Sequence, residues 1–335
     1  MKRINILFTL CGLILITAIF VLSGYSDPNI PPEGKTADYT INGGFCVEDD
    51  VLRWDLEQIN VPETWELVSG GEEILTAVID TGIDQKHPCL KDKVVERINF
   101  SDSEGIDTAR GHGTHIAGLI AATFEDQDNL NGIAYNSKLL DVQVADNDGS
   151  TDAEKVAKGI IWSVNRGAKI INISIVIRDP YPMLEYAVNY AKENDCLIIA
   201  AAGNSGCADS VYPASYPGVI SVAATDRDDR IAGWSNHGDW VDVAAPGVDI
   251  YSILPGDGYG GKNGTSYSTA LVSGQAALLY GIAADTDDDN MLRDEVENLI
   301  LSFSDDLSLQ ELPGKRVNVF RSVNIAAILS AIFSS

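Results

Sequence analysis

An α/β fold of three layers, in which helices cover both faces of a parallel sheet, is expected for this chain of 335 residues. The chain contains short, mainly apolar runs that are apolar on both faces and lack the alternation of strands with one face in water. Amphipathic stretches of helical length separate several of these runs, which is the order of a parallel sheet with crossover helices. The apolar runs are Ile74–Ile83, Leu139–Ala145, Lys169–Ile177, Cys196–Ala202, Val219–Ala224 and Trp240–Ala245.

Two of the expected helices have recognisable ends. Thr151-Asp152 is predicted to cap a helix that runs to about Asn165 and stops before Gly167. A second helix is expected over about Pro182–Glu193. The alternation of runs and helices continues to the C-terminus without a further linker, so one domain over residues 51–335 is expected.

The N-terminal segment predicts export. Met1-Lys2-Arg3 is basic and precedes an almost unbroken apolar run, Ile4–Leu22. That run is long for a signal peptide and close to the roughly 20 residues that a spanning helix needs. Residues 1–24 are therefore interpreted as a signal peptide or a membrane anchor, and residues 25–50 as a linker or short pro-segment. Either form places the body of the chain outside the cell or at its surface, with membrane contact only through this segment.

Charge and cysteine content limit the partners and the cross-links. The chain has 49 acidic and 23 basic residues, a net charge of −26, which argues against nucleic-acid binding and favours cationic partners. Four cysteines follow the leader, and they either form two disulfides or remain thiols. A disulfide between Cys196 and Cys207 is not expected, because the strand between them spans about 20 Å. These cysteines are Cys46, Cys89, Cys196 and Cys207.

Two segments place a reactive side chain beside small residues. Asp80 ends a buried apolar run, where a carboxylate needs a partner such as a histidine, unless the strand end simply faces water. His112 lies between two glycines at the start of a predicted helix. The His112-x-x-His115 spacing lacks the glutamate and the i,i+4 spacing of a zinc-protease helix, so no metal is expected there. His115 is interpreted as structural.

Two further segments could stabilise negative charge. Ser266 stands at the start of an apolar helix that is expected to run to about Tyr280. A helix N-terminus favours an oxyanion that forms at an attacked carbonyl, although a serine there could also be only an N-cap. Asn204 ends the buried run that begins at Cys196, and its amide can donate to such an oxyanion.

Four short sequence motifs, called boxes below, resemble in their order along the chain those of the subtilisin-like serine proteases (subtilases). They are Asp80-Thr81-Gly82, Gly111-His112-Gly113-Thr114-His115, Ala201-Ala202-Gly203-Asn204 and Gly264-Thr265-Ser266, and the similarity runs from about Trp54 to Asn324. The resemblance implies that Asp80 orients His112, that His112 acts as general base, and that Ser266 is the nucleophile. It further implies Asn204 and the Ser266 amide as oxyanion donors, a peptide or protein substrate, and an acyl-enzyme intermediate.

The resemblance also assigns substrate contacts and shows two departures. Ser174, Ile175 and Val176 are similar to the strand that pairs with substrate, and Ala201, Ala202 and Gly203 to a wall of the primary pocket. Val176-Ile177 replaces the glycines usual in the family, which predicts a narrowed, selective cleft. Tyr267 replaces the family's methionine after the nucleophile, and the triad is not touched.

No cofactor and no metal ligand set are predicted. Cys89 stands where an aspartate commonly serves a calcium site in the family, so that site is not expected. A weaker structural calcium near Asp126–Asn129 stays open. Asp285–Asp289 is interpreted as a solvated stretch that favours a helix N-terminus, with a cation site as the alternative.

The function expected from these residues is that of an exported serine endopeptidase, with monomer as the default state. One version would remove leader peptides from modified peptides, and a broader version would digest nutrient or surface proteins. A non-catalytic peptide-binding homologue would lack a triad member, and all four boxes are intact. An α/β-hydrolase esterase is excluded, because that fold needs the order Ser, Asp, His and a Gly-x-Ser-x-Gly elbow.

Overall fold

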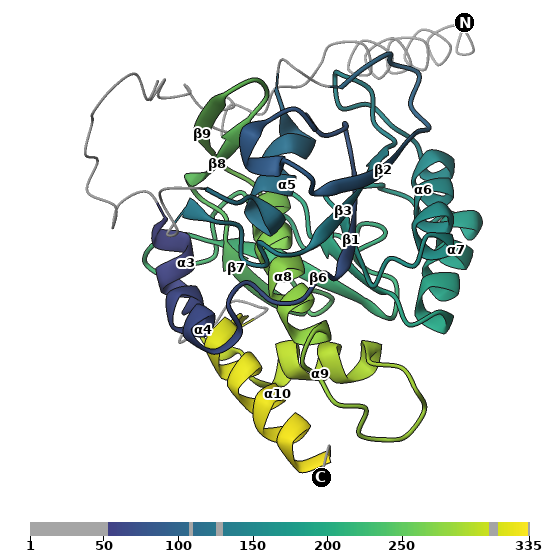
Figure 1. Ribbon diagram of the computed structural model, residues 1–335. Coiled ribbons are helices and arrows are strands. Elements are labelled where there is room, and N and C mark those ends of the chain that lie inside the picture. The colour runs from purple at the N-terminus through teal and green to yellow at the C-terminus, as the bar shows by residue number, and fades with distance from the viewer. Residues whose placement is uncertain (1–52, 107–109, 125–129, 308–313, 334–335) are drawn as a thin grey trace, which may run out of the picture. The chain divides into compact units, whose positions relative to one another are not determined.

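Nine strands form one sheet in the order β10-β11-β7-β6-β5-β4-β1-β3-β2 (Figure 1). The computed structural model describes residues 53–106, 110–124, 130–307 and 314–333. All neighbouring strands are parallel except β10 and β11. The strands of the sheet are β1 Leu75–Asp80, β2 Val94–Asn99, β3 Lys138–Gln143, β4 Ile170–Ile173, β5 Leu197–Ala201, β6 Val219–Thr225, β7 Val243–Pro246, β10 Asp305–Asp306 and β11 Lys315–Arg316.

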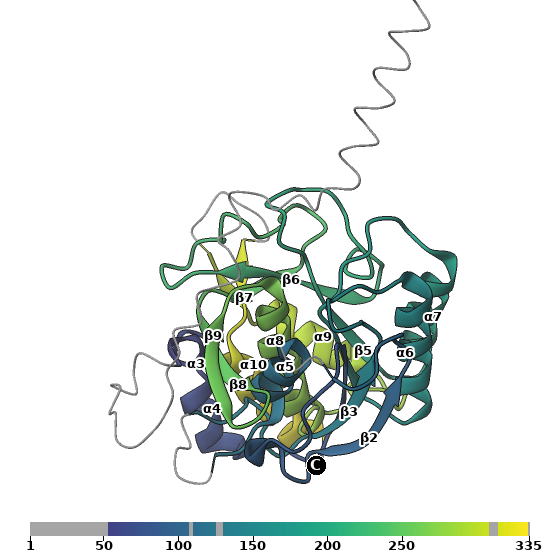
Figure 2. The same ribbon diagram turned by 90° about the horizontal axis from the view of Figure 1, so that it is seen from above.

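Helices cover both faces of this sheet, as the views in Figures 1 and 2 show. Successive β1 side chains enter different cores: Val78 packs in the cluster that includes α5 and α8 residues, and Ile79 in the cluster of α6 and α7. The expected three-layer α/β fold is therefore confirmed. The helices are α3 Trp54–Gln58, α4 Val61–Val68, η1 Pro88–Leu90, α5 His112–Ala121, α6 Ala153–Asn165, α7 Pro182–Glu193, α8 Thr265–Tyr280, α9 Arg293–Ser302 and α10 Val319–Phe333.

Local sequence signals account for the helices that were predicted. The Asp152 carboxylate accepts the Lys155 amide at 2.9 Å and caps α6, while Pro182 occupies the first turn of α7. Every residue of α8 is buried, so this helix forms the centre of one layer. Both predicted α6 and α7 boundaries agree with the structure to within a residue.

Some elements of the fold were not anticipated. Strand β2 lies at the sheet edge and carries Glu96 and Arg97, so it is not a continuous apolar run. The antiparallel hairpin of β8 Ile250–Leu254 and β9 Gly258–Lys262 was also missed, because β9 is rich in glycine. Lys169–Ile177 forms a shorter strand than expected, ending at Ile173.

Several predictions fall on residues outside the described ranges: the leader at 1–24, the linker at 25–50, Cys46 and the segment Asp126–Asn129. Within the described ranges, no helix combines the length and apolar character needed to cross a membrane. Cys196 and Cys207 are free thiols, so the bridge that was not expected between them is indeed not formed. Burial raises the pKa of the Cys196 thiol, which keeps it protonated.

Candidate active site

Asp80 and His112 form a hydrogen-bonded pair in which the carboxylate is buried and the imidazole ring is half-buried. Asp80 is the last residue of β1 and His112 is the first residue of α5. The Nδ1 atom of His112 lies 2.8 and 2.9 Å from the two carboxylate oxygens of Asp80, and the Thr81 amide donates to Oδ1 at 2.7 Å. With Nδ1 donating to the carboxylate, the remaining ring nitrogen, Nε2, carries a lone pair.

The glycine after His112 allows this approach of helix to strand. A Cβ at Gly113 would lie 2.5 Å from the carbonyl oxygen of Gly82 and 3.2 Å from the Cβ of Asp80. Two hydrogen bonds then tie the turn after β1 to the first turn of α5. The Gly113 amide donates to the Thr81 hydroxyl at 3.3 Å, and the Asp84 amide donates to Thr114 Oγ1 at 2.9 Å.

Ser266 lies at the start of α8, and α8 packs against α5, the helix that begins with His112. It is the second residue of α8 and is buried. The ring of the next residue, Tyr267, lies 5.6 Å from the ring of His112 and 4.7 Å from that of His115, measured between centroids. The amide of Ser266 is among the first amides of the helix, which have no carbonyl partner one turn earlier. The structure therefore places Ser266 at a helix N-terminus, directly before a tyrosine whose ring lies beside that of His112.

Asn204 is held at this helix start by the threonine before Ser266. Its Oδ1 accepts from both the amide and the hydroxyl of Thr265, each at 3.0 Å, and the Gly203 amide donates to that hydroxyl at 3.1 Å. Because Oδ1 is occupied by these donors, the Nδ2 hydrogens of the exposed Asn204 are left for another acceptor. Thr265 was not singled out in the sequence, although it lies inside the recognised box.

The second histidine of the box has a structural position. His115 is fully buried and its Nε2 donates to the carbonyl of Gly260 in β9 at 3.0 Å. Burial, with the nearby Lys262 cation, lowers the pKa of His115 well below its usual value, so the ring is neutral. The Ser252 hydroxyl donates to the His115 carbonyl at 3.0 Å. His115 thus joins α5 to the β8–β9 hairpin.

A buried carboxylate behind the site was missed by sequence reasoning. Asp141 of β3 is fully buried and accepts from the Ile83 amide and the Gln85 side chain, both at 3.2 Å, beside Arg97 at 3.3 Å. It therefore holds the turn that follows Asp80. Burial raises the pKa of Asp141 to about 6, against the opposing effects of Arg97 and these hydrogen bonds. A single aspartate within an apolar run carries no local signal of this role.

The predicted substrate residues lie around Ser266 and Gly203. The Ser174 hydroxyl donates to the carbonyl of Ser266 at 3.3 Å, and Ile175 is half-buried. Val176 is 41% exposed, and a Cβ on Gly203 would lie only 3.3 Å from its Cγ2. The valine side chain therefore lies near Gly203.

The two alanines of the predicted pocket wall are buried. Ala201 ends β5, and Ala202 packs in a small core cluster with Ala223 and Val241. The methyl group of Ala202 thus belongs to the core behind the site. Gly203 lies near both Asn236 and Val176, since a Cβ added there would be 2.7 Å from the Asn236 Nδ2 and 3.3 Å from the Val176 Cγ2.

The surroundings of Cys89 do not fit calcium. Its sulfur lies 3.6 Å from the hydroxyl of Tyr259, and the His87 ring accepts its amide at 3.2 Å. Calcium prefers carboxylate and carbonyl oxygens, whereas a thiol suits softer metals. Cys89 and these neighbours are thus poor ligands for calcium, and the loss of the family's usual calcium site stays a prediction.

The acidic stretch before α9 does not cap that helix. Asp195 accepts the amides of Leu292 and Arg293 at 2.7 and 2.8 Å, while Asp285–Asp289 is mostly exposed, as expected of a solvated stretch, and its charge effect on the helix N-terminus stays a prediction. Asp285 instead accepts amides within its own turn, including Asn290 at 2.8 Å. Three carboxylates of the stretch lie within 4.8 Å of one another, and no ion occupies them.

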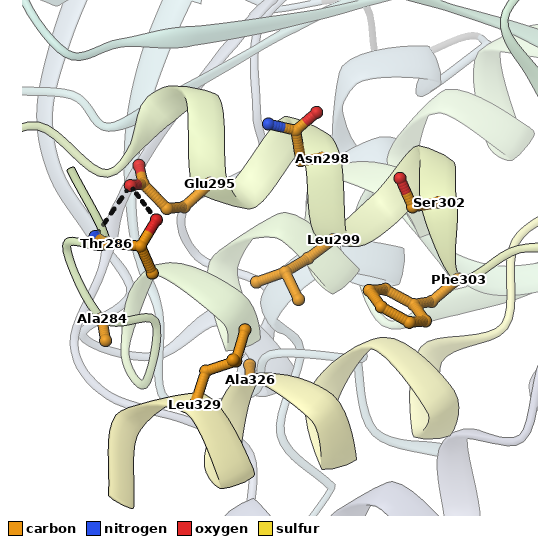
Figure 3. Close-up of a pocket in the computed structure, with 9 residues that line it drawn as sticks. All are labelled: Ala284, Thr286, Glu295, Asn298, Leu299, Ser302, Phe303, Ala326 and Leu329. Carbon is orange, nitrogen blue, oxygen red and sulfur yellow. Dashed lines mark hydrogen bonds between the residues drawn. The ribbon is translucent and has the colours of Figure 1, made fainter. Parts of the chain in front are cut away.

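A separate pocket of about 220 Å³ lies between α9 and α10 (Figure 3). Leu299, Phe303 and Leu329 supply its apolar wall, and Glu295 accepts from the amide and the hydroxyl of Thr286 at 3.0 and 2.9 Å on its rim. None of the predicted site residues lines this pocket.

An Asp–His pair and a serine at a helix N-terminus, on a three-layer α/β scaffold, are the residues that a serine protease of the triad type requires. A family model described as "Subtilase family" matches residues 71–315. The chain therefore belongs to the subtilase family of serine proteases, and the resemblance seen in its motifs is confirmed.

Similar proteins include proteases of known name. The chain is 43% identical over 219 residues to a "Thermophilic serine proteinase" of Bacillus sp. (strain AK1), covering 64% of this chain and 54% of that protein. It is 40% identical over 225 residues to "Thermitase" of Thermoactinomyces vulgaris, covering 67% and 80%. The chain thus spans about half the length of the first relative. A solved structure titled "Structure of Prenylagaramide maturation protease PagA" matches with a TM-score of 0.68 at 29% identity, covering 79% of this chain and 98% of PagA.

Proposed function

We propose that this chain is a serine endopeptidase that cleaves peptide bonds through an acyl-enzyme on Ser266. The observation that carries the proposal is the Asp80–His112 pair beside the N-terminus of α8, where Ser266 stands. Membership of the subtilase family supports it.

The geometry supports a two-stage reaction. His112 donates from Nδ1 to Asp80, so its Nε2 takes the hydroxyl proton of Ser266 as Oγ attacks the carbonyl carbon. The oxyanion accepts from Asn204 Nδ2 and from the Ser266 amide. His112 then gives the proton to the leaving amine, and the C–N bond breaks to leave an ester on Ser266. Water, deprotonated by His112, releases the second product and restores Ser266.

Export and processing belong to the same proposal. The basic, apolar N-terminal segment supports a location outside the cytoplasm. Removal of leader peptides from modified peptides is the second candidate. Two observations favour it: the solved relative is named a maturation protease, and the branched side chain of Val176 lies near Gly203, which suits a selective cleft.

Labelling with a fluorophosphonate probe tests the proposed nucleophile. The folded chain is expected to react at one position, and mass mapping of its peptides should place the label on Ser266. A serine in an assembled triad reacts because His112 removes its proton, so heat-unfolded chain serves as the control. A folded chain that stays unlabelled, or carries the label elsewhere, would count against the proposal.

Val176→Gly is expected to broaden the cleavage specificity. Removing the side chain near Gly203 frees space for larger substrate side chains, so their kcat/KM relative to small ones should rise about tenfold or more. Cleavage of a peptide library by both forms measures the change. Val176→Ala should lie between them, and an unchanged library profile would refute the narrowed cleft.

A further inference from the structure

A buried asparagine outside the four boxes holds the turn that carries Asn204. Asn236 lies between β6 and β7 and is 1% exposed. Its Oδ1 accepts the amides of Ser205 and Cys207 at 2.9 and 3.3 Å, and its Nδ2 donates to the carbonyl of Ala202 at 2.8 Å. One side chain therefore bonds to the backbone on both sides of Asn204.

Backbone hydrogen bonds add to this connection. The Asn236 amide donates at 2.8 Å to the carbonyl of Gly203, the residue directly before Asn204. The Gly206 amide, on the other side of the turn, donates to the carbonyl of Trp234 at 2.8 Å. The turn is thus held on both sides by a segment that is far from it in the sequence.

The central sheet in turn fixes Asn236. The Ser235 hydroxyl donates to the carbonyl of Asn236 at 3.1 Å and accepts the amide of Ala224, a residue of β6, at 3.0 Å. The neighbouring strand β5 ends at Ala201, shortly before Asn204. Asn236 therefore connects the turn after β5 to the end of β6. Groups that are supported in this way by a rigid sheet are held more precisely than groups on a free loop.

Two different residues hold the two parts of Asn204. Thr265 donates to its side-chain oxygen, and Asn236 holds the backbone from which that side chain extends. An oxyanion donor must lie about 2.7 to 3.1 Å from the oxygen that becomes charged, and a shift of about 1 Å can cost about 10²-fold in rate. Correct placement of the Asn204 Nδ2 therefore depends on both residues.

We propose that Asn236 is a positioning residue of the reaction, which holds the Asn204 Nδ2 where the oxyanion forms. The inference rests on the proposed endopeptidase function, in which Asn204 is an oxyanion donor. Asn236 acts through the turn and does not act on the substrate itself. A residue that only stabilised the fold would have no effect that depends on Asn204, and this difference can be measured.

A double-mutant cycle on kcat separates positioning from stability. Asn204→Ala is expected to lower kcat about 10²- to 10³-fold on a short chromogenic peptide. Asn236→Ala should lower kcat about 30-fold and change KM by less than about threefold, because the transition state needs the donor more than the bound substrate does. In the Asn204→Ala background, the same change should lower kcat less than about threefold, since no donor is left to misplace.

Asn318→Ala is the matched control. Asn318 is also buried and uses both ends of its amide, since it accepts from the Arg321 amide and donates to Asp305, each at 2.9 Å. Its removal should lower the melting temperature, while kcat changes less than about threefold in both backgrounds. Each variant is assayed well below its melting temperature. If Asn236→Ala does not fold, Asn236→Ser, which keeps a hydroxyl for the turn, takes its place in the cycle.

The inference is overturned if the Asn236 change lowers kcat by the same factor in both backgrounds, or if it lowers only the melting temperature. It also falls if Asn204→Ala leaves kcat unchanged, because Asn204 is then no oxyanion donor, and the endopeptidase function would still stand. A folded parent chain that cleaves no peptide and takes no fluorophosphonate label would instead refute the proposed function, and this inference with it.

Discussion

Asp80→Asn is expected to lower kcat about 10⁴-fold while leaving the fold intact. Both Asp80 oxygens lie within 2.9 Å of His112 Nδ1, so the carboxylate selects the tautomer with its proton on Nδ1. An asparagine of the same shape would offer an N–H to Nδ1 and favour the proton on Nε2. The nitrogen that must accept the Ser266 proton would then already carry one. The measurement is kcat on a short chromogenic peptide, with thermal unfolding to verify the fold.

Asp84→Asn is the matched control for this change. Asp84 lies in the same turn, and its carboxylate accepts the amides of Gly256 and Lys86 at 2.8 and 3.1 Å and no histidine ring. Neutralising it keeps the shape of the side chain, so kcat is expected to change by less than about tenfold, as for a residue outside the chemistry. If Asp80→Asn costs no more than Asp84→Asn, Asp80 does not orient the general base.

The central sheet was predictable because its strands are buried on both faces. Such strands appear in the sequence as apolar runs, and the burial of every residue of β6 shows why. Strand β2 was not predictable in this way, since it lies at the edge and its Glu96 forms an ion pair with Arg166, the residue after α6. Most residues of strand β9 are glycines, which leave no side-chain pattern to recognise, and the position of the strand depends on its pairing with β8.

The site was predictable in its motifs and less so in its supports. Asp80, His112, Ser266 and Asn204 each lie in a short box whose neighbours are small, and the structure brings these boxes together. The capping of α9 by Asp195 joins residues 97 positions apart, so no local pattern could show it. The burial of Asp141 likewise depends on groups from other elements.

Asp141→Asn is expected to change how stability depends on pH. Burial raises the pKa of this carboxyl to about 6, above the usual value of about 3.9, so the folded chain binds the proton more tightly than the unfolded chain. This contribution favours the folded state below about pH 4 and is lost as the pH rises through about 6. Asparagine does not titrate. The free energy of unfolding of the variant, minus that of the parent, should therefore rise by about 2 kcal/mol between about pH 4 and about pH 7.5.

Denaturant unfolding at a series of pH values, in the Ser266→Ala background to prevent self-digestion, measures this difference. Taking variant minus parent cancels the other titrating groups, which both chains share. Asp285→Asn supplies the opposite sign: the hydrogen bond from the Asn290 amide lowers the pKa of Asp285, so its carboxylate stabilises the folded chain at neutral pH and loses that effect as the pH falls. The variant-minus-parent difference should then fall with rising pH. A flat difference for Asp141→Asn would mean that the carboxylate is as well solvated in the folded chain as in the unfolded one, which its full burial between β1 and Arg97 contradicts.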